Sequence, residues 1–120
     1  MGKVMTNRAN IKVSLFGILP LIFSFHAFAD EPVDADAAIK LARSQSCLRC
    51  HAVSKRKEGP SYADVAKRYK EDKDAEIIIF QEITQSPRMR MSDGHKEAHR
   101  AVQNTSKEQI MNLVHWILAQ

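Results

Sequence analysis

Apolar residues recur at helical spacing along much of the chain. In the segment 34–46, which Asp34 or Asp36 can cap, small and apolar residues three and four positions apart share one face. Ser61 precedes a shorter segment, 62–70, whose apolar stripe consists of Tyr62, Val65, Ala66 and Tyr69. Both patterns are typical of amphipathic helices with one buried face, so we predict helices over these two segments.

The segment 74–85 is more ambiguous, because its four consecutive apolar residues, 77–80, would also suit a buried strand. The alanine and glutamates that flank this run favour a helix that Asp74 caps and that ends before Pro87. We therefore predict a third helix here. The next segment, 88–104, is predicted to be a loop with at most one helical turn.

A last helix is predicted near the end of the chain. Thr105 and Glu108 have the spacing of a capping box. The apolar residues that follow recur at positions i, i+3, i+4, i+7 and i+8, namely Ile110, Leu113, Val114, Ile117 and Leu118. Since no segment alternates between apolar and polar residues as a half-buried strand would, the predicted fold class is all-α.

The first 29 residues differ from the rest in composition. Three basic residues and no acidic residue accompany an apolar run, 13–25, that is too short to span a membrane. Ala27 and Ala29 then supply the small residues that an export peptidase reads. This pattern predicts a signal peptide, residues 1–29, cleaved after Ala29, and a single domain, residues 30–120, without a membrane span. An uncleaved N-terminal anchor is the alternative interpretation.

The charge of the whole chain does not describe the exported domain. The 120 residues contain 18 basic and 14 acidic side chains, but three of the basic ones lie in the leader. Without the leader the numbers are 15 and 14, and this balance gives no indication of nucleic-acid binding. A domain of 91 residues buries only a modest core, so a bound cofactor would add to its stability.

Both cysteines of the chain lie in one short motif, C-L-R-C-H, in which His51 directly follows Cys50. The pattern C-x-x-C-H is that of a covalent haem site. In such a site the thiols of Cys47 and Cys50 add to the haem vinyl groups as thioethers, and the imidazole of His51 binds the iron. Haem attachment takes place outside the bacterial cytoplasm, which requires the export signal that the leader supplies. We therefore predict one covalently bound haem c.

Two other chemistries use paired cysteines. A zinc site would combine Cys47 and Cys50 with His95 and His99, but compact zinc domains have a much shorter spacer and His51 would have no role. A dithiol switch usually accompanies a βαβ pattern, which this sequence lacks. Nothing in the sequence resembles a nucleophile–base pair or a phosphate loop, so we do not expect an enzyme.

Over residues 34–120 the sequence resembles the small bacterial class I cytochromes c. The similarity lies in CLRCHAV, in EGPSYADVAKRY and in the closing LVHWILAQ. The resemblance implies four to five helices around the haem, with the first and last helices crossing near it. It also implies that Gly59 and Pro60 form the proximal loop, in which the proline carbonyl orients the imidazole of His51.

The distal side departs from the family pattern, because the chain has no Met-Pro loop. The spacing usual in the family, counted back from Trp116, falls near Arg100, beside His99. The segment DGHKEAH, residues 93–99, is also similar to a D-G-x-x-E-x-H segment of some small cytochromes. An open distal position is one alternative. The candidate sixth ligands, in order of preference, are His99, Met91, Met89 and His95.

The predicted function is that of a periplasmic monohaem electron carrier that exchanges single electrons with redox protein partners. Lys55, Arg56 and Lys57 lie beside the haem motif and would steer a partner with acidic groups, although a solvated loop has the same composition. An open or labile distal position would instead suit a protein that binds or senses a small gas. Carbon monoxide binding by the reduced protein separates the two functions.

Overall fold

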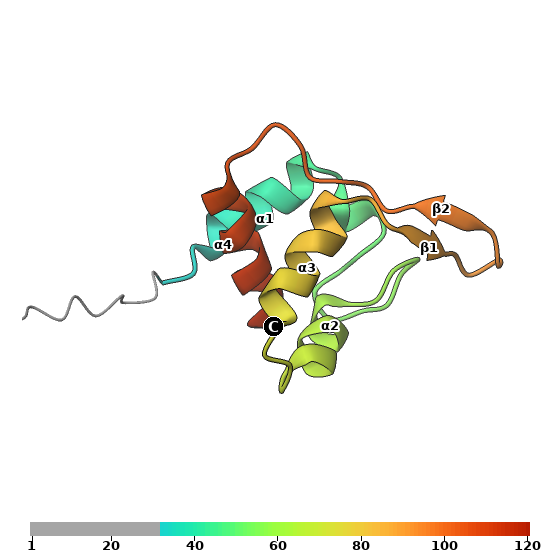
Figure 1. The fold of residues 1–120 in the computed structure, drawn as a ribbon, viewed down its shortest axis with the longest axis horizontal. Helices are drawn as coiled ribbons and strands as arrows, with labels where there is room; N and C mark the ends of the chain where they lie inside the picture. The colour runs from blue at the N-terminus through green and yellow to red at the C-terminus, as the bar shows by residue number, and fades with distance from the viewer. Residues whose placement is uncertain (1–31) are drawn as a thin grey trace, which may run out of the picture. The chain divides into compact units, whose positions relative to one another are not determined.

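The computed structural model describes residues 32–120, which form four α-helices, one 3₁₀ turn and a small hairpin (Figure 1). In chain order the elements are α1 (Ala35–Ser44), η1 (Cys47–Arg49), α2 (Tyr62–Tyr69), α3 (Ala75–Thr84), β1 (Arg88–Arg90), β2 (Lys96–Ala98) and α4 (Lys107–Leu118). None of these helices combines the length and apolarity that crossing a membrane requires. The predicted leader, residues 1–29, lies outside the described residues. The predominance of helix confirms the predicted fold class.

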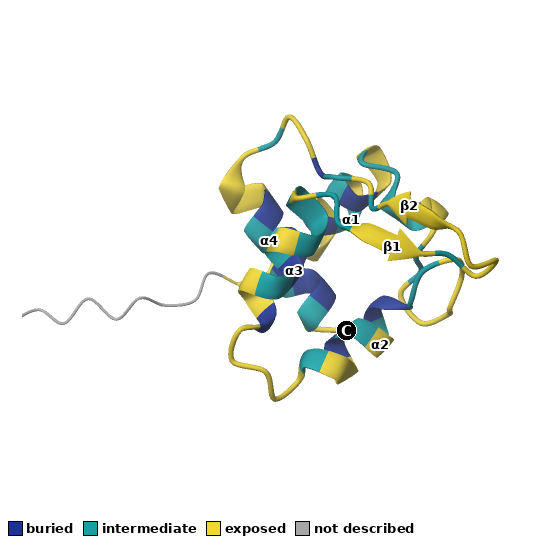
Figure 2. Ribbon diagram, turned by 45° about the vertical axis from the view of Figure 1, so that its right-hand side comes forward, coloured by how far each residue is buried: buried dark blue, intermediate teal, exposed yellow. Residues whose placement is uncertain are grey.

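The core lies where α4 packs against the three other helices. Leu113 of α4 is almost fully buried, and Ala38 and Ala42 of α1 are fully buried in the same cluster. Figure 2 shows the buried residues gathered on the inner sides of the helices. Asn112 of α4 also joins α1, because Asp34 N donates to Asn112 Oδ1 at 2.9 Å and Asn112 Nδ2 donates to Asp34 O at 2.8 Å. The start of α1 is thereby held to α4.

The first and third predicted helices are confirmed. α1 begins with a side-chain cap, since Asp34 Oδ1 accepts a hydrogen bond from Ala37 N at 2.9 Å. The ambiguous apolar segment is the helix α3, which buries Ile79 while Ile77 remains 56% exposed. The side chain of Asp74 precedes α3 without making the predicted capping bond.

The capping box of the last helix lies one residue later than predicted. Ser106 Oγ accepts a hydrogen bond from Gln109 N at 3.3 Å, and Gln109 Oε1 accepts one from Ser106 N at 3.2 Å. Thr105 and Glu108 are therefore not the pair that caps α4. The sequence offers two adjacent hydroxyl residues, each followed three positions later by a side chain that fits the motif, so spacing alone does not distinguish them.

The predicted loop at 88–104 contains an antiparallel hairpin instead of a helical turn. Gly94, with φ of +91°, lies at the turn, and its N–H donates to Met91 O at 3.0 Å. Every strand residue is exposed, so the sequence carries no alternation of apolar and polar residues that would predict a strand. The hairpin projects from the helices (Figure 1). Its cross-strand pairs are Arg88 with Ala98, Met89 with Glu97, and Arg90 with Lys96.

Candidate haem site

A cavity of about 730 Å³ collects nearly all the residues predicted for the site. Its walls come from η1 and the loop after it, from α2, α3 and α4, and from the hairpin. His95 does not line this cavity. The predicted site residues that do line it are Cys47, Cys50, His51, Gly59, Pro60, Met89, Met91 and His99.

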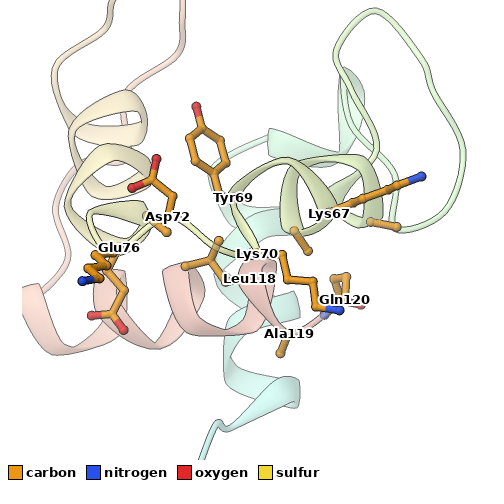
Figure 3. A pocket seen from close by; sticks show the side chains of 12 residues that line it. Lys67, Tyr69, Lys70, Asp72, Glu76, Leu118, Ala119 and Gln120 are labelled. Atoms are coloured by element: carbon orange, nitrogen blue, oxygen red, sulfur yellow. The ribbon is translucent and has the colours of Figure 1, made fainter.

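A second cavity, of about 560 Å³, lies at the ends of α2, α3 and α4 (Figure 3). Tyr69 borders both cavities, but no predicted site residue lines the second one. Every predicted site residue that lines one of these two cavities therefore lines the first one. The charged side chains of the second are Lys67, Lys70, Asp72, Lys73 and Glu76.

The C-x-x-C-H motif folds into a tight turn that directs its three reactive side chains into the first cavity. Ser46 adopts a left-handed φ of 62° immediately before η1. Cys50 N and His51 N then donate to Cys47 O at 3.2 and 3.0 Å. Cys47 is half-buried and Cys50 exposed, and both are free thiols. Burial raises the pKa of the Cys47 thiol, and the nearby charge of Arg100 opposes this shift.

The loop at 59–60 restrains the ring of His51 through a hydrogen bond and a close contact. The ring nitrogen Nδ1 of His51 lies 2.8 Å from Pro60 O. A carbonyl can only accept, so Nδ1 carries the hydrogen and Nε2 keeps its lone pair free. Gly59 lies against the same ring: a Cβ at this position would be 2.4 Å from His51 Cε1. Only glycine therefore fits beside the imidazole without displacing it.

His99 lies on the cavity wall with its ring next to that of His51. The ring centroids are 6.0 Å apart and the ring planes are inclined by 58°. The main chain of His99 is held at the base of the hairpin, where its N–H donates to Pro87 O at 2.8 Å. His99 Nδ1 is buried and has no hydrogen-bond partner. Burial, and then the nearby His51, lower the pKa of His99.

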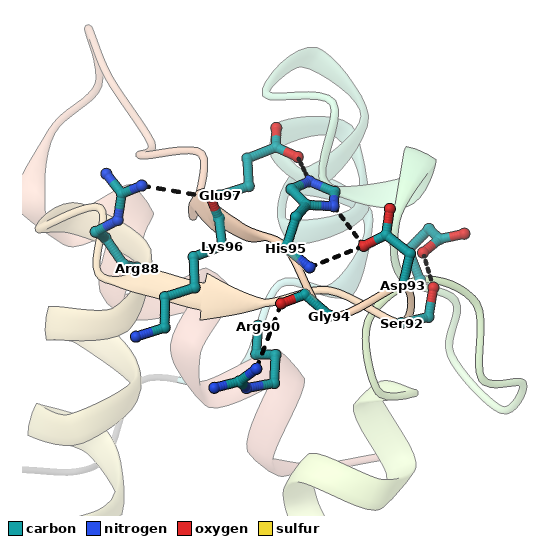
Figure 4. Close-up of polar contacts among 9 residues, drawn as sticks. Arg88, Arg90, Ser92, Asp93, Gly94, His95, Lys96 and Glu97 are labelled. Atoms are coloured by element: carbon teal, nitrogen blue, oxygen red, sulfur yellow. Dashed lines mark hydrogen bonds and ion pairs between the residues drawn. The ribbon is translucent and has the colours of Figure 1, made fainter.

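The other distal candidates are placed differently. Met89 and Met91 border the cavity, but Met89 is 37% exposed on β1. His95 is exposed near the tip of the hairpin, where its Nδ1 bonds to Asp93 and its Nε2 lies 3.6 Å from Glu97 Oε2 (Figure 4). The bond to Asp93 raises the pKa of His95. The structure thus brings His99, rather than His95, to His51.

The residues of the alternative zinc site are not gathered in one place. His95 contacts Asp93 and Glu97 on the hairpin, whereas Cys47 and Cys50 border the cavity. Within residues 32–120, no group of three or more histidine, cysteine, aspartate or glutamate side chains is arranged to hold a metal ion. His115, the remaining histidine of residues 32–120, lies near Glu76 instead, with Nε2 3.4 Å from Glu76 Oε2.

The cavity has the features that a covalently held haem requires. Two thiols and an imidazole with a free nitrogen border it together, and the orphaned nitrogen of His99 offers a second polar group. Apolar side chains of α3 and α4, such as Ile79 and Leu113, form part of its lining. Arginines suit the propionate carboxylates of a haem. The arginines that line the cavity are Arg49, Arg56, Arg68, Arg90 and Arg100.

Comparison with known proteins agrees with this geometry. The family model for cytochrome c matches residues 35–120. Cytochrome c-552 of Hydrogenobacter thermophilus is 32% identical over 80 residues, which cover 67% of this chain and 78% of that protein. Cytochrome c2 of Rhodocyclus tenuis is 30% identical over 87 residues, which cover 66% of this chain and 87% of that protein.

Solved structures show the same relationship. The class 1 cytochrome MtoD from Sideroxydans lithotrophicus ES-1 superposes with a TM-score of 0.71 at 44% identity, covering 72% of this chain and 96% of that one. Cytochrome c552 of Nitrosomonas europaea superposes with a TM-score of 0.55 at 25% identity, covering 68% and 96%. The chain belongs to the cytochrome c family, as a small class I member. Members of this family bind haem c covalently and transfer electrons.

The structure adds a residue that the sequence did not single out for the site. Tyr62 stacks on the ring of His51, with centroids 5.5 Å apart and planes inclined by only 15°. In the sequence it is part of the apolar stripe of α2, and a core role explained it fully. Its position two residues after Pro60 is the only local signal for this contact.

Proposed function

We propose that the protein is a periplasmic monohaem electron carrier in which Cys47 and Cys50 hold the haem through thioethers. In this proposal His51 and His99 would each supply a ring nitrogen to the iron. The observation that carries the proposal is the 6.0 Å separation of the two imidazole centroids. Two imidazoles, each with a nitrogen about 2 Å from one metal ion, have centroids roughly 6 Å apart. The separation therefore suits a single iron between the rings.

Hydrogen bonding supports the role of each imidazole. Because Nδ1 of His51 is engaged by Pro60 O, its Nε2 is the nitrogen left for the iron. The same bond restrains the ring and raises its basicity. On the other side, the buried Nδ1 of His99 without a partner indicates a ring whose polar surroundings are incomplete until a ligand is present.

The methionines are weaker candidates for the distal ligand. Met89 lies on an exposed strand, paired across the hairpin with Glu97, and it is more than a third exposed. Met91 is half-buried beside the turn, where its N–H donates to His95 O at 2.9 Å. Both methionines border the cavity, but it is the His99 ring that lies beside the ring of His51.

Haem iron supplies one-electron chemistry, and two imidazole ligands favour the ferric state relative to a methionine–histidine pair. The chain holds the two imidazoles in fixed positions and limits the access of water with apolar side chains such as Ile79, Leu113 and Ile117. Electron transfer requires no bond making at the protein, which is why we propose a carrier rather than an enzyme.

The proposed location rests on the leader. Residues 1–29 combine a basic start, an apolar run and small residues at Ala27 and Ala29, and we propose that they are removed after Ala29. Covalent haem attachment outside the cytoplasm requires export of the chain. Residues 30–120 would then act in the periplasm, free of the leader.

We further propose that the redox partners present acidic groups near the haem edge. Lys55, Arg56 and Lys57 are exposed in the loop after the motif, and Arg56 borders the cavity. Lys57 Nζ donates to Leu48 O at 2.6 Å, which keeps this cation over the motif. Positive charge beside the redox centre raises the association rate of an anionic partner.

The double variant Lys55→Glu/Arg56→Glu tests this charge effect. Oxidation of the reduced protein by ferricyanide should become several-fold slower at low ionic strength, and oxidation by a cationic cobalt(III) complex should become faster. Added salt should reduce both differences. Stopped-flow absorbance measures the rates. The control Lys40→Glu/Lys107→Glu makes the same change of charge at exposed residues that do not line the cavity. Equal effects of the two variants would argue against a local docking role.

The optical spectrum of the exported protein tests the proposed function. We expect the mass of one haem on the chain that begins at Asp30, a low-spin ferric spectrum without the near-infrared band of methionine–iron ligation, and no ready binding of carbon monoxide after reduction. A methionine–iron band would show that a methionine, and not His99, binds the iron. The proposed function as an electron carrier would still stand. Ready binding of carbon monoxide by the reduced protein would favour a small-gas-binding function instead. Absence of haem would overturn the proposal as a whole.

A further inference from the structure

The orientation of the His51 ring is determined by more than its hydrogen bond. The bond from Nδ1 to Pro60 O restrains the imidazole, but a single hydrogen bond still tolerates some rotation of the ring about its Cβ–Cγ bond. Tyr62 supplies the missing constraint, because its ring lies nearly parallel to the imidazole at a centroid separation of 5.5 Å. This separation is typical of an offset stack. The plane of His51 therefore follows the plane of Tyr62.

Tyr62 is itself held from several directions. It begins α2, and Ser61 caps that helix by accepting a hydrogen bond from Asp64 N at 3.0 Å. Tyr62 N donates to Ala52 O at 3.0 Å, which ties the start of α2 to the residue after His51. The Tyr62 side chain is only 4% exposed. Its backbone and ring consequently have little freedom.

The ring of Tyr62 is also in contact with the core of the molecule. Trp116 of α4 meets it edge-on, with centroids 5.3 Å apart and planes inclined by 73°. Trp116 is 6% exposed and belongs to the main apolar cluster. A continuous set of ring contacts thus runs from α4 through Tyr62 to His51. The packing of the helices is thereby connected to the plane of the proximal imidazole.

The main chain of His99 has a support of its own at the base of the hairpin, where its N–H donates to Pro87 O. The two imidazole planes are inclined by 58°, well away from parallel. In low-spin ferric haem each imidazole interacts most strongly with the iron d orbital perpendicular to its plane. Crossed planes act on both orbitals of the pair and leave them closer in energy, which raises the largest g value.

We infer that Tyr62 is a positioning residue that fixes the plane of the His51 imidazole and so keeps the two axial rings crossed. This inference rests on the proposed function, since it takes His51 and His99 as the axial ligands. It gives Tyr62 a role in the electronic structure of the site in addition to its place in the core. Loss of the flat ring, rather than loss of the hydroxyl, should release His51.

Electron paramagnetic resonance of the frozen ferric holoprotein measures this arrangement. The unmodified protein should have a largest g value above that of bis-imidazole haems with parallel rings. Tyr62→Phe retains the stacked ring and should leave the g values unchanged. Tyr62→Leu removes the flat surface, and should shift and broaden the largest g value as His51 adopts a range of orientations. The reduction potential of Tyr62→Leu should shift as well.

Phe80→Leu is the matched control, because Phe80 packs against the same apolar cluster as Tyr62 but does not line the cavity. Its g values should equal those of the unmodified protein. Identical g values in Tyr62→Leu, or a spectrum of parallel rings in the unmodified protein, would overturn the inference. The second test needs no substitution, so it holds even if Tyr62→Leu fails to fold.

Failure of the inference is distinguishable from failure of the proposed ligand set. A methionine–iron band in the near infrared would show that His99 is not the ligand. The hyperfine-shifted haem methyl resonances in proton NMR depend on the plane of His51 with either distal ligand. Their pattern should then still change in Tyr62→Leu and not in Tyr62→Phe, and an unchanged pattern would exclude Tyr62 as the positioning residue.

Discussion

Replacement of His99 by alanine should convert the ferric protein from low spin to largely high spin. The substitution removes the imidazole that lies 6.0 Å from His51, which is the proposed distal ligand. The Soret band should shift accordingly, and the reduced variant should bind carbon monoxide at close to one equivalent. The absorption spectrum of the ferric variant measures the first effect, and optical titration of the reduced variant with carbon monoxide measures the second. The fold should remain, since His99 is only partly buried and lies outside the main apolar cluster.

His95→Ala is the control for this prediction. His95 is exposed on the hairpin, where its contacts are with Asp93 and Glu97, so its removal should leave the spectrum and the spin state unchanged. A low-spin spectrum retained in His99→Ala would show that another side chain, Met91 or Met89, binds the iron. The double variants of His99→Ala with each methionine would then identify which one.

Substitution of Gly59 by alanine should disrupt the proximal side of the site. The added Cβ would lie 2.4 Å from Cε1 and 2.8 Å from Nδ1 of the His51 ring, so either the loop or the imidazole must move. Gly59 N donates to Cys50 O at 2.8 Å, which restrains the loop. Overpacking of this kind costs about 1–3 kcal/mol of folding stability. We also expect a mixed-spin ferric spectrum, because the displaced imidazole also loses its hydrogen bond to Pro60.

Gly94→Ala separates this effect from the general cost of losing a glycine. Gly94 has φ of +91°, but a Cβ there would meet nothing within 4 Å. Its substitution should strain the hairpin turn and leave the Soret spectrum unchanged. Denaturant unfolding, followed by circular dichroism and by the Soret band, measures both variants. A Gly59→Ala protein with unaltered spectrum and stability would show that the loop yields without cost.

The proximal half of the site was predictable from sequence because its residues are neighbours in the chain. Cys47, Cys50 and His51 form one turn, and Pro60 is only nine positions from the ring it contacts. Local spacing therefore carries most of the geometry there. The helices were predictable for a related reason, since an apolar stripe needs only the period of the helix to be recognised.

The distal half of the site was less predictable from the sequence, because its geometry depends on tertiary structure. The hairpin consists of exposed residues, so nothing in its apolar pattern indicates strands. Sequence spacing made His99, Met91, Met89 and His95 all candidates for the distal ligand. Only the fold shows that the His99 ring lies beside His51 and that the His95 ring lies near the hairpin tip. Tyr62 was missed for a similar reason, since a residue that packs in the core and also stacks on His51 has the same sequence pattern as one that only packs.

The contact at the base of the hairpin should allow residues to be inserted into the hairpin. His99 N meets Pro87 O at 2.8 Å, so the chain leaves the helical body and returns to it at the same place. The position of His99 therefore does not depend on the length of the hairpin, residues 88–98. Extra residues introduced at the exposed turn around Gly94 would lengthen the hairpin without moving the His99 imidazole at its base. The turn is therefore an anchoring point at which a dye, a peptide tag or an electrode linker can be attached within reach of the redox centre.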